Sequence, residues 1–263
     1  MNNLMDIFAF WQSISDPRIS QKFSMDSIMS PIKILILYIV LLIIIVKLME
    51  NREPFELKKF MISYNLCQVI ASFYNSFEII YLAIQSRFSL TCQPVDYSED
   101  YYAKRMANAI YFYYLMKLAD LIDTIIFALR KKSNQISFLH VYHHISMVLT
   151  AWSGTKWVAG GQTFLICTLN SLVHAVMYSY YGLAALGPSV QKYLWWKKYL
   201  TQFQLIQFTI VISHAITNLF QKDCTYPKGW SWAAIIYTTL MALLFMNFYK
   251  KSYGKKMQKV HSN

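Results

Sequence analysis

The feature of this chain that most restricts its fold is a series of apolar segments, each long enough to cross a membrane. A membrane-spanning helix needs about 20 mostly apolar residues. Seven segments satisfy this condition, at about residues 32–49, 59–83, 108–129, 137–153, 162–186, 198–220 and 230–249. The stretches between them are too short for a soluble domain. The sequence therefore predicts an all-α membrane protein with seven transmembrane helices, in a single polytopic domain over residues 1–263.

Composition excludes the main alternatives to a membrane protein. The chain is 56% hydrophobic, 17% aromatic and only 14% charged, whereas soluble domains carry charge on about a quarter of their residues. This apolar and aromatic content excludes a disordered chain, and 7 Gly and 6 Pro exclude a collagen. The net charge is +12, but no soluble basic domain exists, so nucleic acid is not an expected partner.

The positive charges predict the orientation of the chain, because cytosolic loops are enriched in Lys and Arg. One set of alternate loops is richer in these residues. It carries Arg52, Lys58, Lys59, Arg130, Lys131, Lys132, Lys192, Lys197, Lys198, Lys250, Lys251, Lys255, Lys256 and Lys259. We therefore expect this side to be cytosolic, with the N-terminus lumenal and the C-terminus cytosolic.

The four cysteines can be placed on this topology. Cys92 and Cys224 fall in loops on the predicted lumenal side, whereas Cys67 and Cys167 fall inside spans. A disulfide between Cys92 and Cys224 requires an oxidising compartment, which a lumenal location provides. Two free thiols are the alternative.

The third span carries three ionisable residues, which are costly in a membrane and usually face a cavity or one another. Lys117, Asp120 and Asp123 are separated by steps of three, so a helix places them on one face. A buried charge network that holds helices together is the alternative to a functional role.

The fourth span carries His140, His143 and His144, at positions i, i+3 and i+4. This spacing places three imidazoles on one helical face. A single histidine inside a span is usually an interior hydrogen-bonding residue, but three at this spacing are difficult to explain by packing. They indicate a catalytic site.

Further polar side chains follow one face of the fifth span and one of the sixth. They are Asn170, His174, Tyr178 and Tyr181 on the fifth, and Thr201, Gln204 and Gln207 on the sixth. Depths counted at about 1.5 Å per residue place these residues and the three histidines in the cytosolic half of the membrane. We expect a polar chamber there, beneath the basic residues Arg130, Lys131 and Lys132.

Two kinds of chemistry fit a histidine face, and a third interpretation is not enzymatic. A metal site is disfavoured, since di-iron membrane desaturases use more histidines than the 6 present and a straight helix splays these rings poorly. Acyl transfer fits better, with an imidazole as nucleophile toward a thioester and Asn170 stabilising an oxyanion. Cys167 is a rival nucleophile. A transporter or receptor that relays protons through its intramembrane His and Asp residues is the other alternative.

Five blocks of sequence together resemble the very-long-chain fatty acid elongases, the condensing enzymes of the endoplasmic reticulum. The blocks are CQPVDYS at 92–98, KLADLIDTIIFALRKK at 117–132, HVYHH at 140–144, NSLVHAVMYSYYGL at 170–183 and TQFQLIQF at 201–208. The resemblance implies condensation of a long-chain acyl-CoA with malonyl-CoA, with loss of CO2, to a 3-ketoacyl-CoA. It also implies that six spans form an inverted barrel around an acyl tunnel, with the first span outside.

The resemblance assigns roles to residues. It implies that His143 carries the acyl group, that His174 and Asn170 serve the malonyl half-reaction, and that Asp123 orients a histidine. It also implies that His140 and His144 shape and polarise the site. The residues expected to bind substrate are Lys117, Asp120, Arg130, Lys131, Lys132, Tyr178, Tyr181, Thr201, Gln204 and Gln207. The Cys92–Cys224 disulfide also fits the family pattern, and no metal or other cofactor is expected.

The expected location is the endoplasmic reticulum membrane. The expected partners are the two CoA substrates, the bilayer and the ketoreductase, dehydratase and enoyl reductase of the elongation cycle, with a homodimer left open.

Two features depart from the family. Asp120 stands where Glu is common, and the tail KVHSN, with Lys259 and His261, lacks a strict di-lysine retrieval signal.

Overall fold

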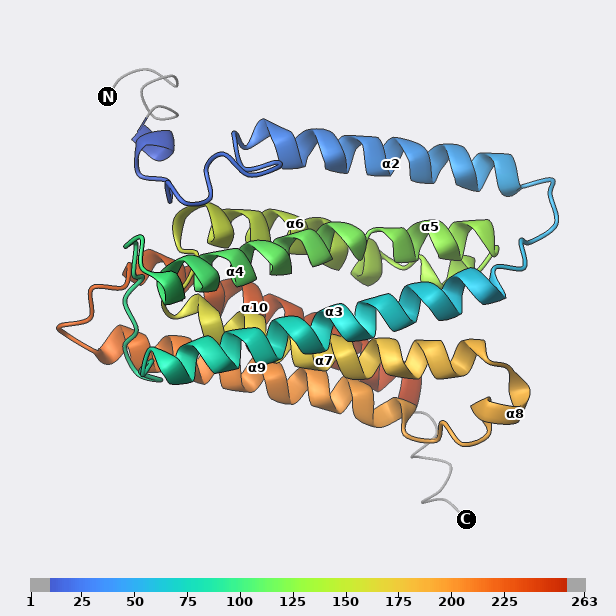
Figure 1. The fold of residues 1–263 in the computed structure, drawn as a ribbon. Coiled ribbons are helices and arrows are strands. Elements are labelled where there is room, and N and C mark those ends of the chain that lie inside the picture. The colour runs from blue at the N-terminus through green and yellow to red at the C-terminus, as the bar shows by residue number, and fades with distance from the viewer. Residues whose placement is uncertain (1–9, 255–263) are drawn as a thin grey trace, which may run out of the picture. The chain divides into compact units, whose positions relative to one another are not determined.

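The computed structural model describes residues 10–254, and in this part of the chain the regular secondary structure is entirely helical (Figure 1). The tail residues Lys259 and His261 lie outside the described part. The helices are α2 (Met29–Met49), α3 (Lys58–Gln85), α4 (Tyr101–Ala119), α5 (Ile122–Leu129), α6 (Phe138–Trp157), α7 (Thr163–Ala185), α8 (Pro188–Gln191), α9 (Lys197–Phe220) and α10 (Lys228–Tyr249). A 3-10 turn at Ser133–Gln135 precedes α6, and a π-helical turn at Lys250–Gly254 follows α10.

The described residues form two compact units. The first unit contains the chain up to Leu57 together with Tyr81–Ser86 and Val95–Phe164, and the second contains Lys58–Ile80, Arg87–Pro94 and the chain from Leu165 onward. The first unit therefore holds α2, α4, α5 and α6, and the second holds most of α3 with α7, α8, α9 and α10. The expectation of one single domain stays a prediction.

In the first unit α4 packs along α6, and α2 packs on α5 and α6 (Figure 1). The inward face of α2 is a narrow stripe, made of Pro31, Leu35, Tyr38, Leu42 and Met49. Most of the other side chains of α2 are large, apolar and exposed. A helix that is apolar all round but buried on one stripe only is suited to lipid contact on its remaining surface.

The segment expected as one continuous span over 108–129 is divided into two helices. Helix α4 ends at Ala119, Asp120 and Leu121 form a turn, and α5 begins at Ile122. The amide of Asp123 donates to the carbonyl of Asp120 (3.2 Å), a bond of the tighter 3-10 type. Lys117 and Asp120 therefore lie at the end of one helix, whereas Asp123 lies in the first turn of the next.

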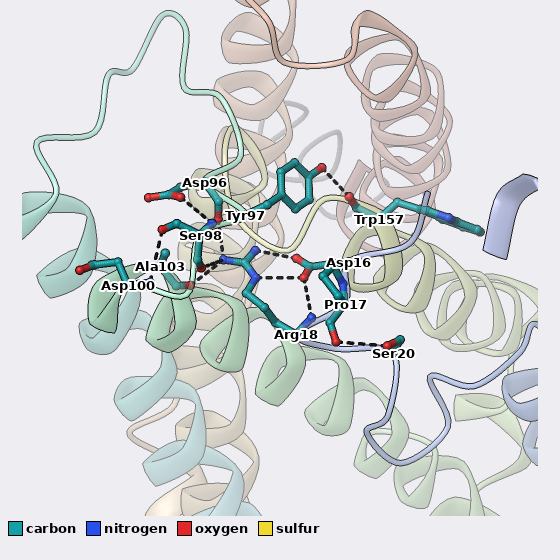
Figure 2. Close-up of polar contacts among 10 residues, drawn as sticks. All are labelled: Asp16, Pro17, Arg18, Ser20, Asp96, Tyr97, Ser98, Asp100, Ala103 and Trp157. Carbon is teal, nitrogen blue, oxygen red and sulfur yellow. Dashed lines mark hydrogen bonds and ion pairs between the residues drawn. The ribbon is translucent and has the colours of Figure 1, made fainter. Parts of the chain in front are cut away.

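An arginine clamp ties the segment before α2 to the rest of the first unit (Figure 2). Arg18 donates from Nε and Nη2 to the carboxylate of Asp16 (2.9 and 2.6 Å), and from Nη1 to the carbonyl of Ala103 (3.2 Å) and that of Asp96. The Tyr97 ring lies 5.6 Å from the guanidinium. Asp16 is 0% exposed, so its carboxylate cannot be stabilised by water. The bidentate pair with Arg18 compensates its charge instead.

Neighbouring bonds extend the attachment of this segment. Lys156, which lies beyond the predicted span 137–153, is in α6, is 1% exposed and donates to the carbonyl of Met25. Trp152 donates from its indole to the carbonyl of Ser24 (2.8 Å), and the Ser24 hydroxyl lies 2.9 Å from that of Tyr114. The segment is therefore held by buried polar contacts as well as by its apolar side chains.

In the second unit α9 and α10 form a closely packed pair (Figure 1). A disulfide joins Cys92, in the loop after α3, to Cys224, between α9 and α10. Lys228, at the start of α10, donates to the carbonyls of Asn218 (2.8 Å), Leu219 (3.1 Å) and Gln221 (2.6 Å). Asn218 and Leu219 lie in the last turn of α9 and Gln221 is its C-cap, so the ammonium binds carbonyls at the C-terminal end of this helix and complements the helix dipole.

Four helices of the described part are long and apolar enough to cross a membrane: α2, α3, α9 and α10 with its extension to Tyr253. Helices α4, α6 and α7, which were also expected to span, are enriched in Tyr, His and Asn, and these residues lower their hydropathy. The coarse prediction of an all-helical protein with several membrane helices is thus confirmed. The seven-helix inverted barrel stays a prediction.

Candidate functional site

The histidine face begins at His140, the third residue of α6. Ser137 is the N-cap of this helix, and its Oγ accepts from the amide of His140 (3.2 Å). This cap sets the start of the helix and with it the angular position of every later residue. The ring centroids of His140 and His144 lie 4.2 Å apart, and those of His143 and His144 lie 5.5 Å apart and nearly perpendicular. The three imidazoles therefore form one contiguous cluster, as their spacing predicts.

His140 has a partner that was not expected from the sequence. Its Nε2 lies 2.9 Å from Oγ1 of Thr124 on α5, and the Tyr38 hydroxyl on α2 donates to the same oxygen (2.8 Å). Thr124 is 0% exposed and Tyr38 is 5% exposed. Thr124 follows Asp123 within a block that resembles the elongases, so its place in that block could have identified it as a candidate site residue. Tyr38 lies in an otherwise apolar span, and no pattern pointed to it.

Lys117 and Asp120 form a buried ion pair at the end of α4. The Lys117 ammonium lies 3.0 Å from Oδ2 of Asp120, and these side chains are 1% and 4% exposed. The Tyr113 ring lies 4.9 Å from the same ammonium. This is the charge network that was weighed as an alternative to a functional role. The expected contact of Lys117 with a CoA phosphate stays a prediction.

The basic residues after α5 differ in their surroundings. Lys131 has a positive φ of 53°, and its ammonium donates to the carbonyls of Glu50 (3.0 Å) and Arg52 (3.1 Å) after α2. Lys132 is exposed, and Arg130 is half-buried. Lys131 therefore fastens the end of α2 to the turn after α5, a structural role that its charge alone did not indicate. Asp123 is 9% exposed, and its expected contact with a histidine stays a prediction.

In the second unit, α7 carries Asn170 and His174 on one face, 8% and 5% exposed. The His174 ring centroid lies 5.8 Å from that of Tyr178, which is 0% exposed and 6.1 Å from Tyr64 of α3. Tyr181 continues the series, 6.2 Å from Tyr178 and 39% exposed. The expected polar and aromatic face of this helix is therefore present.

A row of polar residues on α3 was missed by sequence reasoning. Asn75, which is 0% exposed, donates from Nδ2 to Oγ of Ser171 on α7 (3.0 Å), and Ser76 donates to the carbonyl of Thr168 (3.3 Å). Oγ of Ser72 and Oδ1 of Asn75 are buried without a hydrogen-bond partner. Ser72, Asn75 and Ser76 are spaced i, i+3 and i+4 within the predicted span 59–83. This helical spacing of polar residues in an apolar span is the feature of the sequence that could have revealed the row.

The contact between α3 and α7 determines how α7 is rotated about its axis. Successive residues of a helix are separated by about 100°, so Ser171 lies about a quarter-turn around α7 from Asn170. Small side chains allow the helices to approach closely: a Cβ added to Gly182 would meet Cβ of Asn65 at 3.4 Å. Helix α3 thus contacts α7 through Thr168 and Ser171, and through Tyr178 one turn beyond His174.

The polar residues of α9 are partly buried in the second unit. Thr201 and Gln207 are 5% and 6% exposed, and Nε2 of Gln204 lies 4.0 Å from the sulfur of Met177 on α7. Cys167, the rival nucleophile, is not part of a disulfide and is 2% exposed. Of the expected site residues, the first unit brings together the histidine cluster and the second unit brings Asn170 together with His174.

No three His, Cys, Asp or Glu side chains within residues 10–254 are arranged to hold a metal ion. The described geometry instead offers imidazoles, an amide and buried hydroxyl groups. These groups can act as nucleophile, as general base and as hydrogen-bond donors to a developing oxyanion.

Comparison with known proteins identifies the family. The model of the GNS1/SUR4 (ELO) family matches residues 23–261. Very long chain fatty acid elongase 4 of Mus musculus is 42% identical over 257 residues, which cover 98% of this chain and 82% of the relative. Very long chain fatty acid elongase 7 of Rattus norvegicus is 42% identical over 257 residues, covering 96% and 92%. Very long chain fatty acid elongase 2 of Mus musculus is 40% identical over 254 residues, covering 95% and 86%.

The match covers nearly the whole chain, including every helix from α2 to α10, and it includes all the residues of the histidine cluster. Together with the apolar helices, it identifies a multi-pass membrane protein. This chain belongs to the ELO family, the GNS1/SUR4 family of very long chain fatty acid elongases, and is an enzyme of fatty acid elongation.

Proposed function

We propose that this protein is a 3-oxoacyl-CoA synthase that condenses a long-chain acyl-CoA with malonyl-CoA. The products are a 3-ketoacyl-CoA two carbons longer, free CoA and CO2. The observation that carries the proposal is the extensive identity with very long chain fatty acid elongases, 42% over 98% of this chain for one of them. The cluster of three imidazoles on α6 supplies the groups that acyl transfer needs.

In the first half-reaction, an imidazole nitrogen of His143 attacks the thioester carbonyl of the acyl-CoA. The C–S bond breaks, the CoA thiolate leaves and takes up a proton, and the acyl group remains on the nitrogen as an acyl-imidazole. His140 and His144 lie against each other and next to His143, and they orient the nucleophile and polarise its surroundings. Such an intermediate is reactive toward carbon nucleophiles because imidazole is a good leaving group.

In the second half-reaction, malonyl-CoA loses CO2 and becomes an enolate. Asn170 and His174 stabilise the enolate oxygen by hydrogen bonds, which are strongest where water is excluded. The enolate carbon attacks the acyl carbonyl, the carbon–nitrogen bond breaks, and His143 is regenerated. Both Asn170 and His174 are almost fully buried in the second unit, which suits this role.

The remaining assignments belong to the same proposal. Tyr178, Tyr181, Thr201, Gln204 and Gln207 bind substrate, and Asp123 orients a histidine. Lys117, Arg130, Lys131 and Lys132 bind the anionic groups of CoA, and Asp120 also takes part in substrate binding. The six-helix barrel encloses the acyl chain, and the enzyme requires no cofactor beyond its two CoA substrates. The membrane is that of the endoplasmic reticulum, with the N-terminus lumenal, and the partners are the other enzymes of the elongation cycle.

The test is an elongation assay on the purified protein with labelled malonyl-CoA and acyl-CoAs of graded chain length. Incubation with acyl-CoA alone should release CoA and leave an acyl adduct on His143, identified by mass spectrometry. His143→Ala should abolish the adduct, whereas Cys167→Ala, which removes a buried thiol that is not in a disulfide, should keep it. Failure to extend any acyl-CoA would refute the proposal and favour a transporter or receptor. An adduct on Cys167 would refute the role of His143.

A further inference from the structure

The buried stripe of α2 contains a single hydroxyl group. Among its members Pro31, Leu35, Tyr38, Leu42 and Met49, Tyr38 alone carries a polar side-chain atom. A hydroxyl moved from water into an apolar contact costs free energy unless it forms a hydrogen bond. Phenylalanine would fill the same volume without that cost. Apolar packing alone therefore does not explain why the hydroxyl of Tyr38 is present in this stripe.

The hydrogen bond of Tyr38 leads directly to the histidine cluster. Its hydroxyl donates to Oγ1 of Thr124 (2.8 Å), and the same Oγ1 lies 2.9 Å from Nε2 of His140. A threonine hydroxyl has one proton to donate and two lone pairs. When one lone pair accepts from Tyr38, the threonine proton is available for His140 Nε2. The chain then runs from phenol to hydroxyl to imidazole, across three helices of the first unit.

This direction of donation has a consequence for His140. If Nε2 accepts a hydrogen bond, the ring proton of the neutral imidazole is on Nδ1, because the two nitrogens exchange donor and acceptor roles between tautomers. The His140 ring is packed at a centroid distance of 4.2 Å against His144, which in turn contacts His143. The orientation of His140 is thus transmitted to the neighbouring rings by direct contact.

We propose that Tyr38 and Thr124 are positioning residues of the histidine face, which set the tautomer and the ring orientation of His140 through the chain Tyr38–Thr124–His140. The proposal rests on the proposed condensing activity, in which the histidines act on the acyl-CoA. It assigns a part in the site to α2, a helix whose surface is otherwise apolar and largely exposed. Neither residue touches the reacting atoms in this account, since both act through His140.

The experiment measures kcat and KM for the elongation reaction in Tyr38→Phe, Thr124→Val, Thr124→Ser and the double variant Tyr38→Phe/Thr124→Val. Thr124→Val keeps the side-chain shape and removes the hydroxyl, whereas Thr124→Ser keeps the hydroxyl. Displacing a reacting group by about 1 Å can cost about 100-fold in rate. We expect kcat to fall about 10- to 100-fold in Thr124→Val and less in Tyr38→Phe, with KM for both substrates unchanged and near-normal kcat in Thr124→Ser.

The double variant distinguishes a hydrogen-bond chain through Thr124 from two independent packing effects. If Tyr38 acts through Thr124, removing its hydroxyl has no further effect once the Thr124 hydroxyl is gone, so the double variant should match Thr124→Val alone. Independent losses that multiply would overturn the proposal. Wild-type kcat in both single variants would also overturn it, provided that the wild-type protein extends acyl-CoA. An inactive wild-type protein would instead refute the proposed function.

Tyr114→Phe is the matched control, because it removes another buried tyrosine hydroxyl of the same unit. Tyr114 is 0% exposed, and its hydroxyl lies 2.9 Å from that of Ser24, away from the histidines. We expect this variant to lower the melting temperature and to leave kcat unchanged. If Tyr38→Phe behaves in the same way as Tyr114→Phe, then Tyr38 is only a packing residue and the proposal is wrong. Tyr38→Phe and Thr124→Ser carry the test even if Thr124→Val does not fold.

Discussion

Lys117 and Asp120, one turn apart at the end of α4, form an ion pair that is almost completely withdrawn from solvent. The ammonium and the carboxylate lie 3.0 Å apart, and the two side chains are 1% and 4% exposed. Removing one member of such a pair leaves an uncompensated buried charge, whereas removing both does not. The pair lies where α4 ends, directly before the turn that leads into α5.

We predict that Lys117→Met lowers the free energy of unfolding by about 3–5 kcal/mol, because the Asp120 carboxylate is left buried without its cation. The double variant Lys117→Met/Asp120→Leu should recover much of this loss. Denaturant unfolding in detergent micelles measures both. Lys104 is the control, since its pair with Glu99 is 48% and 70% exposed, and Lys104→Met should change stability by less than about 1 kcal/mol. Equal losses in Lys117→Met and Lys104→Met would contradict the prediction.

The arginine clamp at Asp16 should depend on the forked geometry of the guanidinium as well as on its charge. Arg18→Lys preserves the charge but cannot donate to the Asp16 carboxylate and to the carbonyls of Asp96 and Ala103 together. We expect faster hydrogen exchange at the amides of Asp16 and Ile19 in Arg18→Lys, and faster still in Arg18→Gln. Exchange at α9 and α10 of the second unit serves as the internal control. Unchanged exchange at Asp16 in both variants would show that the clamp does not hold this segment.

The polar contact between α3 and α7 leads to two opposite expectations for neighbouring side chains. A double-mutant cycle on Asn75→Ala and Ser171→Ala should give a coupling energy of about 0.6 kcal/mol and no more than about 1.7 kcal/mol, the average and the maximum measured for hydrogen bonds between helices of a membrane protein. Ser72→Ala removes a buried hydroxyl that has no partner, so it should leave stability unchanged or increase it by about 1 kcal/mol. A clear loss of stability in Ser72→Ala would mean that this hydroxyl binds a water molecule or another group.

The disulfide should contribute strongly to stability, because it joins positions 132 residues apart. In the chain-entropy account, a cross-link over a loop of this length stabilises the folded state by about 4–5 kcal/mol. We predict a lower melting temperature for Cys92→Ala and for wild-type protein under reductant, measured by thermal unfolding in detergent. Cys67→Ala is the control, since Cys67 is an exposed free thiol and should have no effect. The prediction is refuted if the melting temperature of the wild-type protein does not change when reductant is added.

The histidine cluster was accessible from sequence because it depends on spacing within one helix. Residues at i, i+3 and i+4 share a face in any α-helix, so His140, His143 and His144 come together wherever α6 lies. The same reasoning placed Asn170 with His174. It was less successful at Asp120, where a turn interrupts the expected helix. Helical periodicity does not reveal such a turn when the apolar pattern continues on both sides of it.

The sequence by itself determined the properties that arise locally: the apolar helices, the positions of the histidines on α6 and the family of the chain. Only the tertiary structure decided which distant side chains meet. Tyr38 lies 86 residues from Thr124, and Asn75 lies 96 residues from Ser171. Such contacts depend on how whole helices are packed and rotated, which is determined by many weak side-chain interactions summed over each interface. No spacing rule along one helix contains that information.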